Sequence, residues 1–209
     1  MSFTLPPNDP LFAQSWHLSN TGQGGGNPGF DIKALSAWKH YLGRNVLVGV
    51  LDDGTELTHP DLAGNAYVRP VGVTLVDPAN ANLMIGAPQA GDNHGTSAAG
   101  VIAALGNNGL GGDGVAPSAK IVAYRVLGAG SAATSDAFQQ SLNDGVQVTN
   151  NSYGTDTAFN NPGTTLLTMI ASAATTGRGG LGAITVFANG NERRSRVSEN
   201  DLTGSDGGL

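Results

Sequence analysis

Side chains capable of acid–base chemistry occur at two separate places in this sequence. Two carboxylates, Asp52 and Asp53, end the apolar run VLVGVLDDG, and His94 begins the run HGTSAAGVIAAL. A histidine beside a buried carboxylate can act as a general base, because the carboxylate fixes its tautomer and stabilises the imidazolium that forms. The second run also contains Ser97. If Ser97 is the nucleophile, the active site is complete within this chain; otherwise a serine elsewhere must partner His94.

Two further polar turns follow apolar runs. Residues 151–154 (Asn-Ser-Tyr-Gly) follow VQVTN, and residues 189–191 (Asn-Gly-Asn) follow AITVFA. Open parallel sheets bind ligands at the carboxyl ends of their strands, so these turns and Asp52 are expected to converge at one edge. A side-chain amide can stabilise a developing oxyanion, and Asn191 is a candidate for this role. Taken alone, Asn-Gly-Asn is more often a tight turn.

The elements that must position these residues alternate between short apolar runs and helical patterns, which is typical of a parallel sheet covered by helices. Strands are predicted over residues 45–54, 119–127, 146–154 and 183–191. Helices are predicted over residues 31–41, 96–105, 135–145 and 163–177. Asp31 is the expected cap of the first helix. The helix over 96–105 is apolar or small on every side, so burial in the middle of the domain is expected.

Composition limits the function further. The chain has 209 residues, of which 39% are hydrophobic, and it has no apolar stretch long enough to span a membrane. Its net charge of -6 argues against a general nucleic-acid role and fits calcium or cationic peptides as partners. The absence of cysteine excludes disulfides, cysteine catalysis and thiolate metal sites. These properties favour a globular protein with one sizeable core.

At the residues singled out above, the chain resembles the subtilisin-like serine proteases and, within them, the kexin and furin branch. VGVLDDGTELTHPDLAGN is similar to the aspartate motif, HGTSAAGVIAA to the histidine motif, NNSYG to the substrate-strand motif and VFANGN to the oxyanion motif. The resemblance covers nearly the whole chain. It implies an α/β fold of three layers, with a mostly parallel central sheet and helices on both faces. Residues 1–209 would then form the amino-terminal portion of a single catalytic domain, incomplete at its carboxyl end.

The resemblance also implies roles for individual residues. Asp52 would orient His94, His94 would be the general base, and Asn191 would donate a hydrogen bond to the oxyanion. The substrate backbone would bind as an added strand along Ser152, Tyr153 and Gly154.

The nucleophile of the family lies in a separate Gly-Thr-Ser-x-x-Pro motif downstream of the oxyanion asparagine. Ser97 is therefore not expected to be the nucleophile. No other Gly-Thr-Ser occurs in the sequence. The implied partner is a carboxyl-terminal fragment of the same protease that carries this motif and associates with the present chain. The basic run ERRSR, which begins at Glu192, resembles a site that such an enzyme cuts, so we expect self-cleavage near it.

A calcium ion is the expected cofactor. Calcium takes six to eight oxygen ligands, many of them carboxylates and carbonyls. In the family, one calcium is held between a glycine-rich loop and two distant aspartates. The matching residues are Asp9, Asp61, the side chain of Asn108 and the carbonyls of Leu105, Leu110 and Gly112. A second family site needs acidic runs that this chain lacks, since only Asp77 is present there.

The substrates implied by the resemblance are peptides or proteins with basic residues before the cut. Asp53 and Asp92 would line the second pocket, and Asp206 the first. The branch has an acidic residue shortly after Ser-Trp-Gly. Here Tyr153 replaces the Trp, and Asp156 lies one position before the expected place. Loss of that carboxylate would weaken discrimination.

Other interpretations stay open from the residues alone. Asp52 can be a helix cap and His94 a structural histidine, although both occur within four ordered motifs. GLGGDG follows a predicted helix and precedes a strand, which is the reverse of a dinucleotide-binding context, so a loop is expected. The alternative function is a non-catalytic, calcium-binding scaffold. A nucleotide-binding domain would need a phosphate loop that is absent. We expect a secreted, periplasmic or cell-surface location, which the sequence does not determine.

Overall fold

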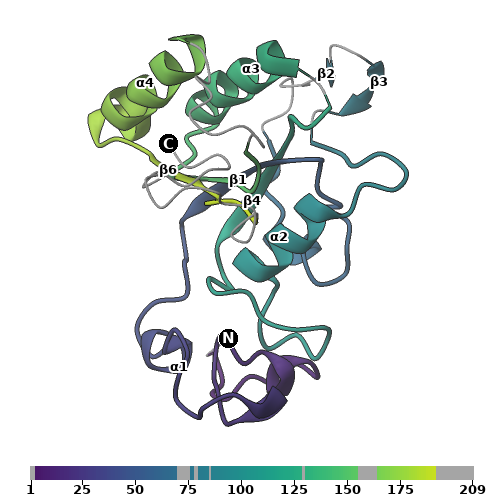
Figure 1. Ribbon diagram of the computed structural model, residues 1–209, viewed down its shortest axis with the longest axis vertical. Helices are drawn as coiled ribbons and strands as arrows, with labels where there is room; N and C mark the ends of the chain where they lie inside the picture. The colour runs from purple at the N-terminus through teal and green to yellow at the C-terminus, as the bar shows by residue number, and fades with distance from the viewer. Residues whose placement is uncertain are drawn as a thin grey trace, which may run out of the picture. The chain divides into compact units, whose positions relative to one another are not determined.

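The computed structural model describes residues 3–69, 76–77, 80–84, 86–128, 130–154 and 164–191. The chain divides into two compact units (Figure 1). Unit 1 consists of residues 1–47, 56–68 and 96–122, and unit 2 of residues 48–55, 69–95 and 123–209. No helix in the described ranges is long and apolar enough to cross a membrane.

Among the described residues, the main sheet has four strands in the order β4-β1-β5-β6. Its strands are β1 (Leu47–Asp52), β4 (Lys120–Arg125), β5 (Val148–Asn151) and β6 (Ile184–Phe187). β5 pairs in parallel with both β1 and β6, and the register aligns Leu51, Asn151 and Phe187 across the three strands. The polar turns that follow these residues therefore begin at one edge of the sheet, and the prediction of an α/β fold with a parallel sheet is confirmed.

Residues 47–51 of strand β1 are apolar, and the strand is buried on both faces. Val50 and Leu51 are fully buried, and Val48 is nearly so. Strands covered on both sides have continuous rather than alternating apolar sequences. This pattern is why the run could be identified from the sequence.

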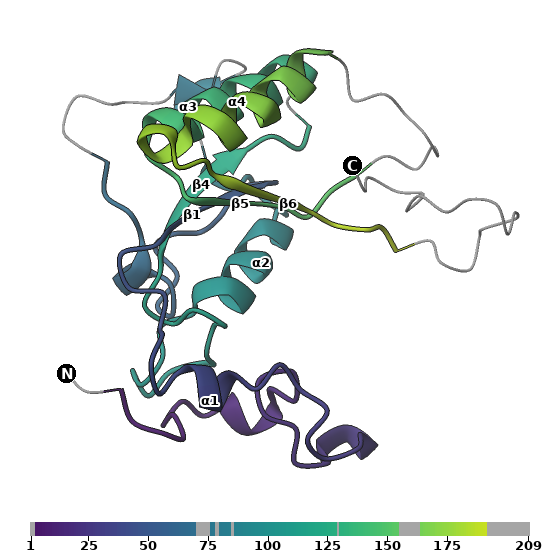
Figure 2. The ribbon, with the colours of Figure 1, turned by 90° about the vertical axis from the view of Figure 1, so that its left-hand side faces the viewer.

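Two helices of unit 2, α3 (Gly130–Asn143) and α4 (Thr164–Gly180), pack against each other. They lie side by side on one face of β5 and β6 (Figure 2). Phe138 of α3 is buried and stacks on Phe187, with ring centroids 6.5 Å apart. α3 begins five residues before its predicted start. α4 leaves helical geometry at Gly177, and the chain then turns back into β6.

Each unit also contains smaller elements. In unit 2, β2 (Val76–Asp77) and β3 (Asn80–Met84) form an antiparallel pair. Unit 1 contains the short 3-10 helices η1 (Phe12–Gln14), η2 (Gln23–Gly25) and η3 (Ala63–Asn65). Its amino-terminal part packs around Trp38, whose Nε1 donates to the Val115 carbonyl at 2.9 Å.

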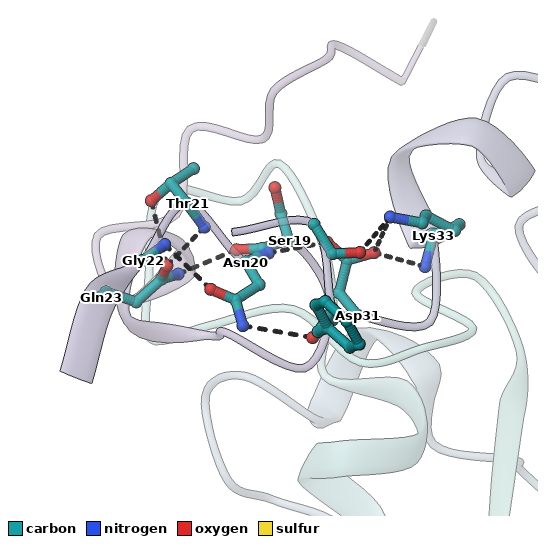
Figure 3. Close-up of polar contacts among 9 residues, drawn as sticks. Ser19, Asn20, Thr21, Gly22, Gln23, Asp31 and Lys33 are labelled. Carbon is teal, nitrogen blue, oxygen red and sulfur yellow. Dashed lines mark hydrogen bonds and ion pairs between the residues drawn. The ribbon is translucent and has the colours of Figure 1, made fainter. Parts of the chain in front are cut away.

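The helix predicted over residues 31–41 is mostly wrong, because α1 spans only Ala34–Ala37. Asp31 does not cap it. Instead, Asp31 Oδ2 accepts a hydrogen bond from the Asn20 amide and Oδ1 accepts one from the Lys33 amide, both at 2.8 Å (Figure 3). Asp31 therefore closes the loop that precedes α1, and Lys33 enters the helix with a positive φ of 60°.

Helix α2 (His94–Ala103) begins at the predicted histidine, two residues before the predicted range. Ala99 and Ala103 are fully buried, but Val101 is 55% exposed. The prediction that this helix is buried on every side is therefore wrong within the described structure. Small apolar residues on all sides permit close packing but do not require it.

Candidate active site

The buried carboxylate Asp52 and the exposed histidine His94 form a hydrogen-bonded pair. Asp52 ends β1 and is fully buried, whereas His94 begins α2 and has a side chain that is 57% exposed. The Nδ1 atom of His94 lies 2.8 Å from Oδ1 of Asp52. Burial raises the pKa of Asp52 above its ordinary value, against the lowering effect of His94, and the hydrogen bond to Asp52 raises the pKa of His94. The two predicted members of a catalytic pair are thus brought together.

A second carboxylate, Asp53, fixes the backbone from which His94 projects. Its Oδ2 accepts hydrogen bonds from the amides of His94 at 3.0 Å and Asn93 at 3.2 Å, and its Oδ1 accepts one from Gly95 at 2.7 Å. Amides at a helix start have no partner within the helix, and a carboxylate there is also favoured by the helix dipole. Although burial by itself raises the pKa of Asp53, the three amides hold it below the usual range.

Gly95 allows this first turn of α2 to approach the end of β1. A Cβ atom at Gly95 would lie 2.3 Å from the Gly54 carbonyl oxygen and 2.8 Å from Cβ of Asp52. Any larger residue would push His94 away from Asp52. The sequence predicted a substrate-binding role for Asp53 and missed its structural one. The available signal was a second carboxylate at a strand end, since α2 has no acidic residue in its first turn.

The pair has the chemistry of a general base. With Nδ1 turned to the carboxylate, Nε2 is the nitrogen that can take a proton from a nucleophile. Ser97 lies on the first turn of α2 and is exposed. That Ser97 is not the nucleophile stays a prediction.

Replacing Asp52 with Asn should lower the pKa of His94. The variant removes the negative charge that favours the protonated imidazole. The NMR titration of the His94 ring protons should therefore have its midpoint at lower pH than in the native protein. Asp136→Asn, which removes an exposed carboxylate on α3, should leave the His94 curve unchanged. Identical curves for native protein and Asp52→Asn would show that the carboxylate does not control this histidine.

The predicted substrate residues Ser152, Tyr153 and Gly154 directly follow β5. The Asn150 side-chain Nδ2 donates to Ser152 Oγ at 2.8 Å, and the Tyr153 hydroxyl donates to Asn151 Oδ1 at 3.1 Å. The Tyr153 ring meets Phe187 edge-on, with centroids 6.1 Å apart. Burial and the charge of Asp52 raise the pKa of Tyr153. Tyr153 thus packs over the carboxyl ends of β5 and β6, close enough to Asp52 to feel its charge.

The remaining residues predicted around the site have different surroundings. Asp92 accepts a hydrogen bond from the Gln89 amide at 2.9 Å and forms an ion pair with Arg125 at 3.1 Å, a partner that the sequence did not indicate. Asn191 is exposed and lies four residues beyond β6. Asp156, Asp206 and the ERRSR run lie outside the described residues, as does the side chain of Asp77.

The six predicted calcium ligands gather in unit 1 around the loop that follows α2. Asp9 accepts hydrogen bonds from the amides of Asn107, Asn108 and Gly109, at 2.6 to 3.0 Å. Asp61 Oδ1 accepts one from the Asn108 side chain at 2.8 Å, and its Oδ2 accepts one from the Gly112 amide at 3.0 Å. The loop is thus built around two buried carboxylates, and GLGGDG is a loop as predicted.

The other two members are tied into the same loop. The Leu105 amide donates to the Asp61 carbonyl at 2.8 Å, and the Leu110 amide donates to Asn108 Oδ1 at 2.7 Å. Gly111 is required here, because a Cβ atom on it would lie 2.2 Å from Asp61 Oδ2. The loop therefore keeps its backbone close to the Asp61 carboxylate.

A third carboxylate, Asp113, lies beside this loop and was not predicted. It is 5% exposed, and neither of its oxygens has a hydrogen-bond partner. Burial, together with the charges of Asp9 and Asp61, raises its pKa to about 8. In the described ranges, no group of three or more His, Cys, Asp or Glu side chains is arranged to hold a metal ion. A calcium site here would need carbonyl and amide oxygens in addition to carboxylates, and the unpartnered buried carboxylate fits a nearby cation.

Comparison with known proteins agrees with this geometry. Residues 43–207 match the peptidase S8, subtilase family. The chain belongs to the subtilase family, and the resemblance to its kexin and furin branch is confirmed. The PC3-like endoprotease variant B of Hydra vulgaris is 38% identical over 194 residues, which are 88% of this chain and 26% of that protein. Neuroendocrine convertase 2 of Homo sapiens is 35% identical over 195 residues, which are 88% of this chain and 30% of that protein.

Solved structures show the same fold. The serine protease of Aeromonas sobria has a TM-score of 0.70 and 31% identity, and the match covers 90% of this chain and 33% of that one. A protease from Pseudoalteromonas arctica has a TM-score of 0.64 and 26% identity, and its match covers 88% of this chain and 59% of that one. The chain therefore spans less than a third of the length of the two convertase-like relatives and a third of the Aeromonas structure.

Proposed function

We propose that this chain supplies the aspartate, the histidine and the oxyanion asparagine of a serine endopeptidase. The observation that carries the proposal is the 2.8 Å contact between fully buried Asp52 and exposed His94. A buried carboxylate stabilises the imidazolium, and an exposed ring leaves Nε2 open to a serine and a substrate.

Each group has one role in the proposed reaction. His94 takes the proton of the serine hydroxyl as the hydroxyl attacks the peptide carbonyl, and then gives that proton to the leaving amine. Asp52 holds the ring and stabilises its charged form. Asn191 donates a hydrogen bond to the negatively charged oxygen of the tetrahedral intermediate. The substrate backbone lies along Ser152 and Gly154 as an added strand.

The serine comes from a Gly-Thr-Ser segment outside these 209 residues, on a carboxyl-terminal piece that binds this chain. The edge strand β6 supports such a partner, because its apolar residues Ile184 and Val186 are 58% and 47% exposed. Exposed apolar residues on a sheet edge favour association with further structure.

A serine-reactive fluorophosphonate probe tests this assignment. After gel filtration, denaturing mass spectrometry should find the probe on a co-purifying Gly-Thr-Ser polypeptide and not on Met1–Leu209. A folded monomer of this chain without a partner and without labelling would instead favour the non-catalytic scaffold. Labelling of Ser97 itself would contradict the assignment of the nucleophile.

Calcium is the proposed cofactor of the loop after α2. Asp9, Asp61, the Asn108 side chain and the carbonyls of Leu105, Leu110 and Gly112 would hold it. When bound, the ion contributes positive charge that stabilises buried carboxylates and the loop conformation. These residues lie in unit 1, whereas Asp52 and His94 lie in unit 2, so the role proposed for calcium is structural.

Cleavage after basic residues is the proposed specificity. Two relatives are a convertase and a convertase-like endoprotease, and Asp53, Asp92, Asp156 and Asp206 offer negative charge for basic side chains. The backbone amides bound to Asp53 and the ion pair of Asp92 with Arg125 reduce the attraction that these two carboxylates can offer to a basic side chain of the substrate. Equal kcat/KM values for matched peptides with Arg or Gln before the cut would argue against basic specificity.

A further inference from the structure

Asp113 is a buried charged residue that the proposed ligand set does not use. Its side chain is 5% exposed, and its two oxygens lack hydrogen-bond partners. A Cβ atom on Gly106 would lie 2.6 Å from Asp113 Oδ1 and 2.7 Å from the ring of Phe3. The Gly106 backbone and the Phe3 ring therefore lie near this carboxylate, and neither carries a charge.

The nearest charges make its burial more costly. Asp9 and Asp61 are 4% and 6% exposed, and both repel Asp113. Three backbone amides bind Asp9, and two donors bind Asp61, but Asp113 has neither kind of support. Among the described residues, no ion pair includes any of the three aspartates. An isolated buried carboxylate is strongly unfavourable unless a counter-charge compensates it.

We propose that Asp113 is a third anionic group of the loop site, one that strengthens cation binding through its charge rather than as part of the Asp9–Asp61–Asn108 ligand set. This inference rests on the calcium site proposed above. The affinity of calcium sites depends on how many negative charges surround the ion. A cation between Asp9 and Asp61 would supply the counter-charge that Asp113 lacks. In return, Asp113 would increase the affinity of the site.

The inference requires opposite effects of one substitution in the two states of the site. Asp113→Asn removes the charge with little change of shape, and Asp113→Val removes both the charge and the need for hydrogen bonds. Without calcium, Asp113→Val removes a buried polar group that lacks hydrogen-bond partners and lies near two other carboxylates, so its melting temperature should rise. With calcium, the same variant loses attraction to the ion, so its affinity should fall.

Calcium titration calorimetry and melting curves in excess chelator test these effects on the purified protein with any bound partner retained. We expect Asp113→Asn to bind Ca²⁺ about tenfold more weakly, or worse, than the native protein. We expect Asp113→Val to melt at a higher temperature than the native protein in chelator, and to lose that advantage in saturating Ca²⁺. The matched control is Asp136→Asn, which removes one negative charge from the exposed surface of α3 and should change neither measurement.

The possible outcomes distinguish a failure of the Asp113 inference from a failure of the proposed calcium site. If the native protein binds Ca²⁺ and both Asp113 variants bind it equally well, the Asp113 charge does not contribute to the site, and the inference is wrong. If the native protein and all variants fail to bind Ca²⁺, the proposed site is wrong and the inference fails with it. Asp113→Val keeps the test usable if Asp113→Asn does not fold.

Discussion

His94→Ala should reduce peptide hydrolysis by about 10⁴-fold to 10⁶-fold, because removing one member of an Asp–His–Ser unit disables the whole unit. The assay is kcat/KM for a fluorogenic peptide with Arg before the cut, measured with the serine-bearing sequence present. The His94 ring is mostly exposed, so its loss should leave the fold intact. An unchanged melting temperature of the variant would check that point.

Ser97→Ala provides the matched control on the same helix. Ser97 lies one turn along α2 from His94 and is exposed, so its substitution should change kcat/KM by less than a few fold. If Ser97→Ala instead removed activity and His94→Ala did not, the roles assigned to these two residues would be wrong. Equal large losses from both variants would identify Ser97 as the nucleophile.

Removal of calcium should destabilise the protein substantially. A ligand that binds only the folded state stabilises it by about 3–4 kcal/mol when present at 100 to 1,000 times its Kd. For a domain of this size, such a loss lowers the melting temperature by on the order of 10 °C. Melting curves in saturating calcium and in excess chelator measure the difference directly.

Asp61→Asn should abolish most of this response, because both oxygens of Asp61 face the loop. Asp136→Asn should retain it. Identical melting curves in calcium and in chelator, together with no metal found by elemental analysis, would contradict the proposed calcium site.

The parts of the fold that could be predicted are those determined by local pattern. β1 was recognisable because both of its faces are buried, so its sequence is apolar throughout. The Asp52–His94 pair was recognisable from motif order, and the structure places the two atoms 2.8 Å apart. The helix over 31–41 failed because its apolar residues pack into an irregular amino-terminal core, where periodicity indicates burial without helix.

Two contacts around the candidate site that sequence reasoning missed depend on residues far apart in the chain. Asp53 reaches amides 40 to 42 residues away, and Asp92 pairs with Arg125, 33 residues away. Neither partner is marked by spacing or by residue type. Asp113 escaped notice for a related reason, since a lone Asp in a glycine-rich loop normally indicates an exposed turn. Only its burial beside Asp9 and Asp61 distinguishes it.

The three amides bound by Asp53 affect how the Asp52–His94 pair can separate. Because the carboxylate binds the backbone of His94 and Gly95 directly, the first turn of α2 cannot unwind without releasing Asp53. Opening of this turn would therefore move the His94 backbone from the end of β1 and expose these two amides to solvent. The hydrogen–deuterium exchange rates of the His94 and Gly95 amides thus report how often this turn opens, even when no substrate or serine is present.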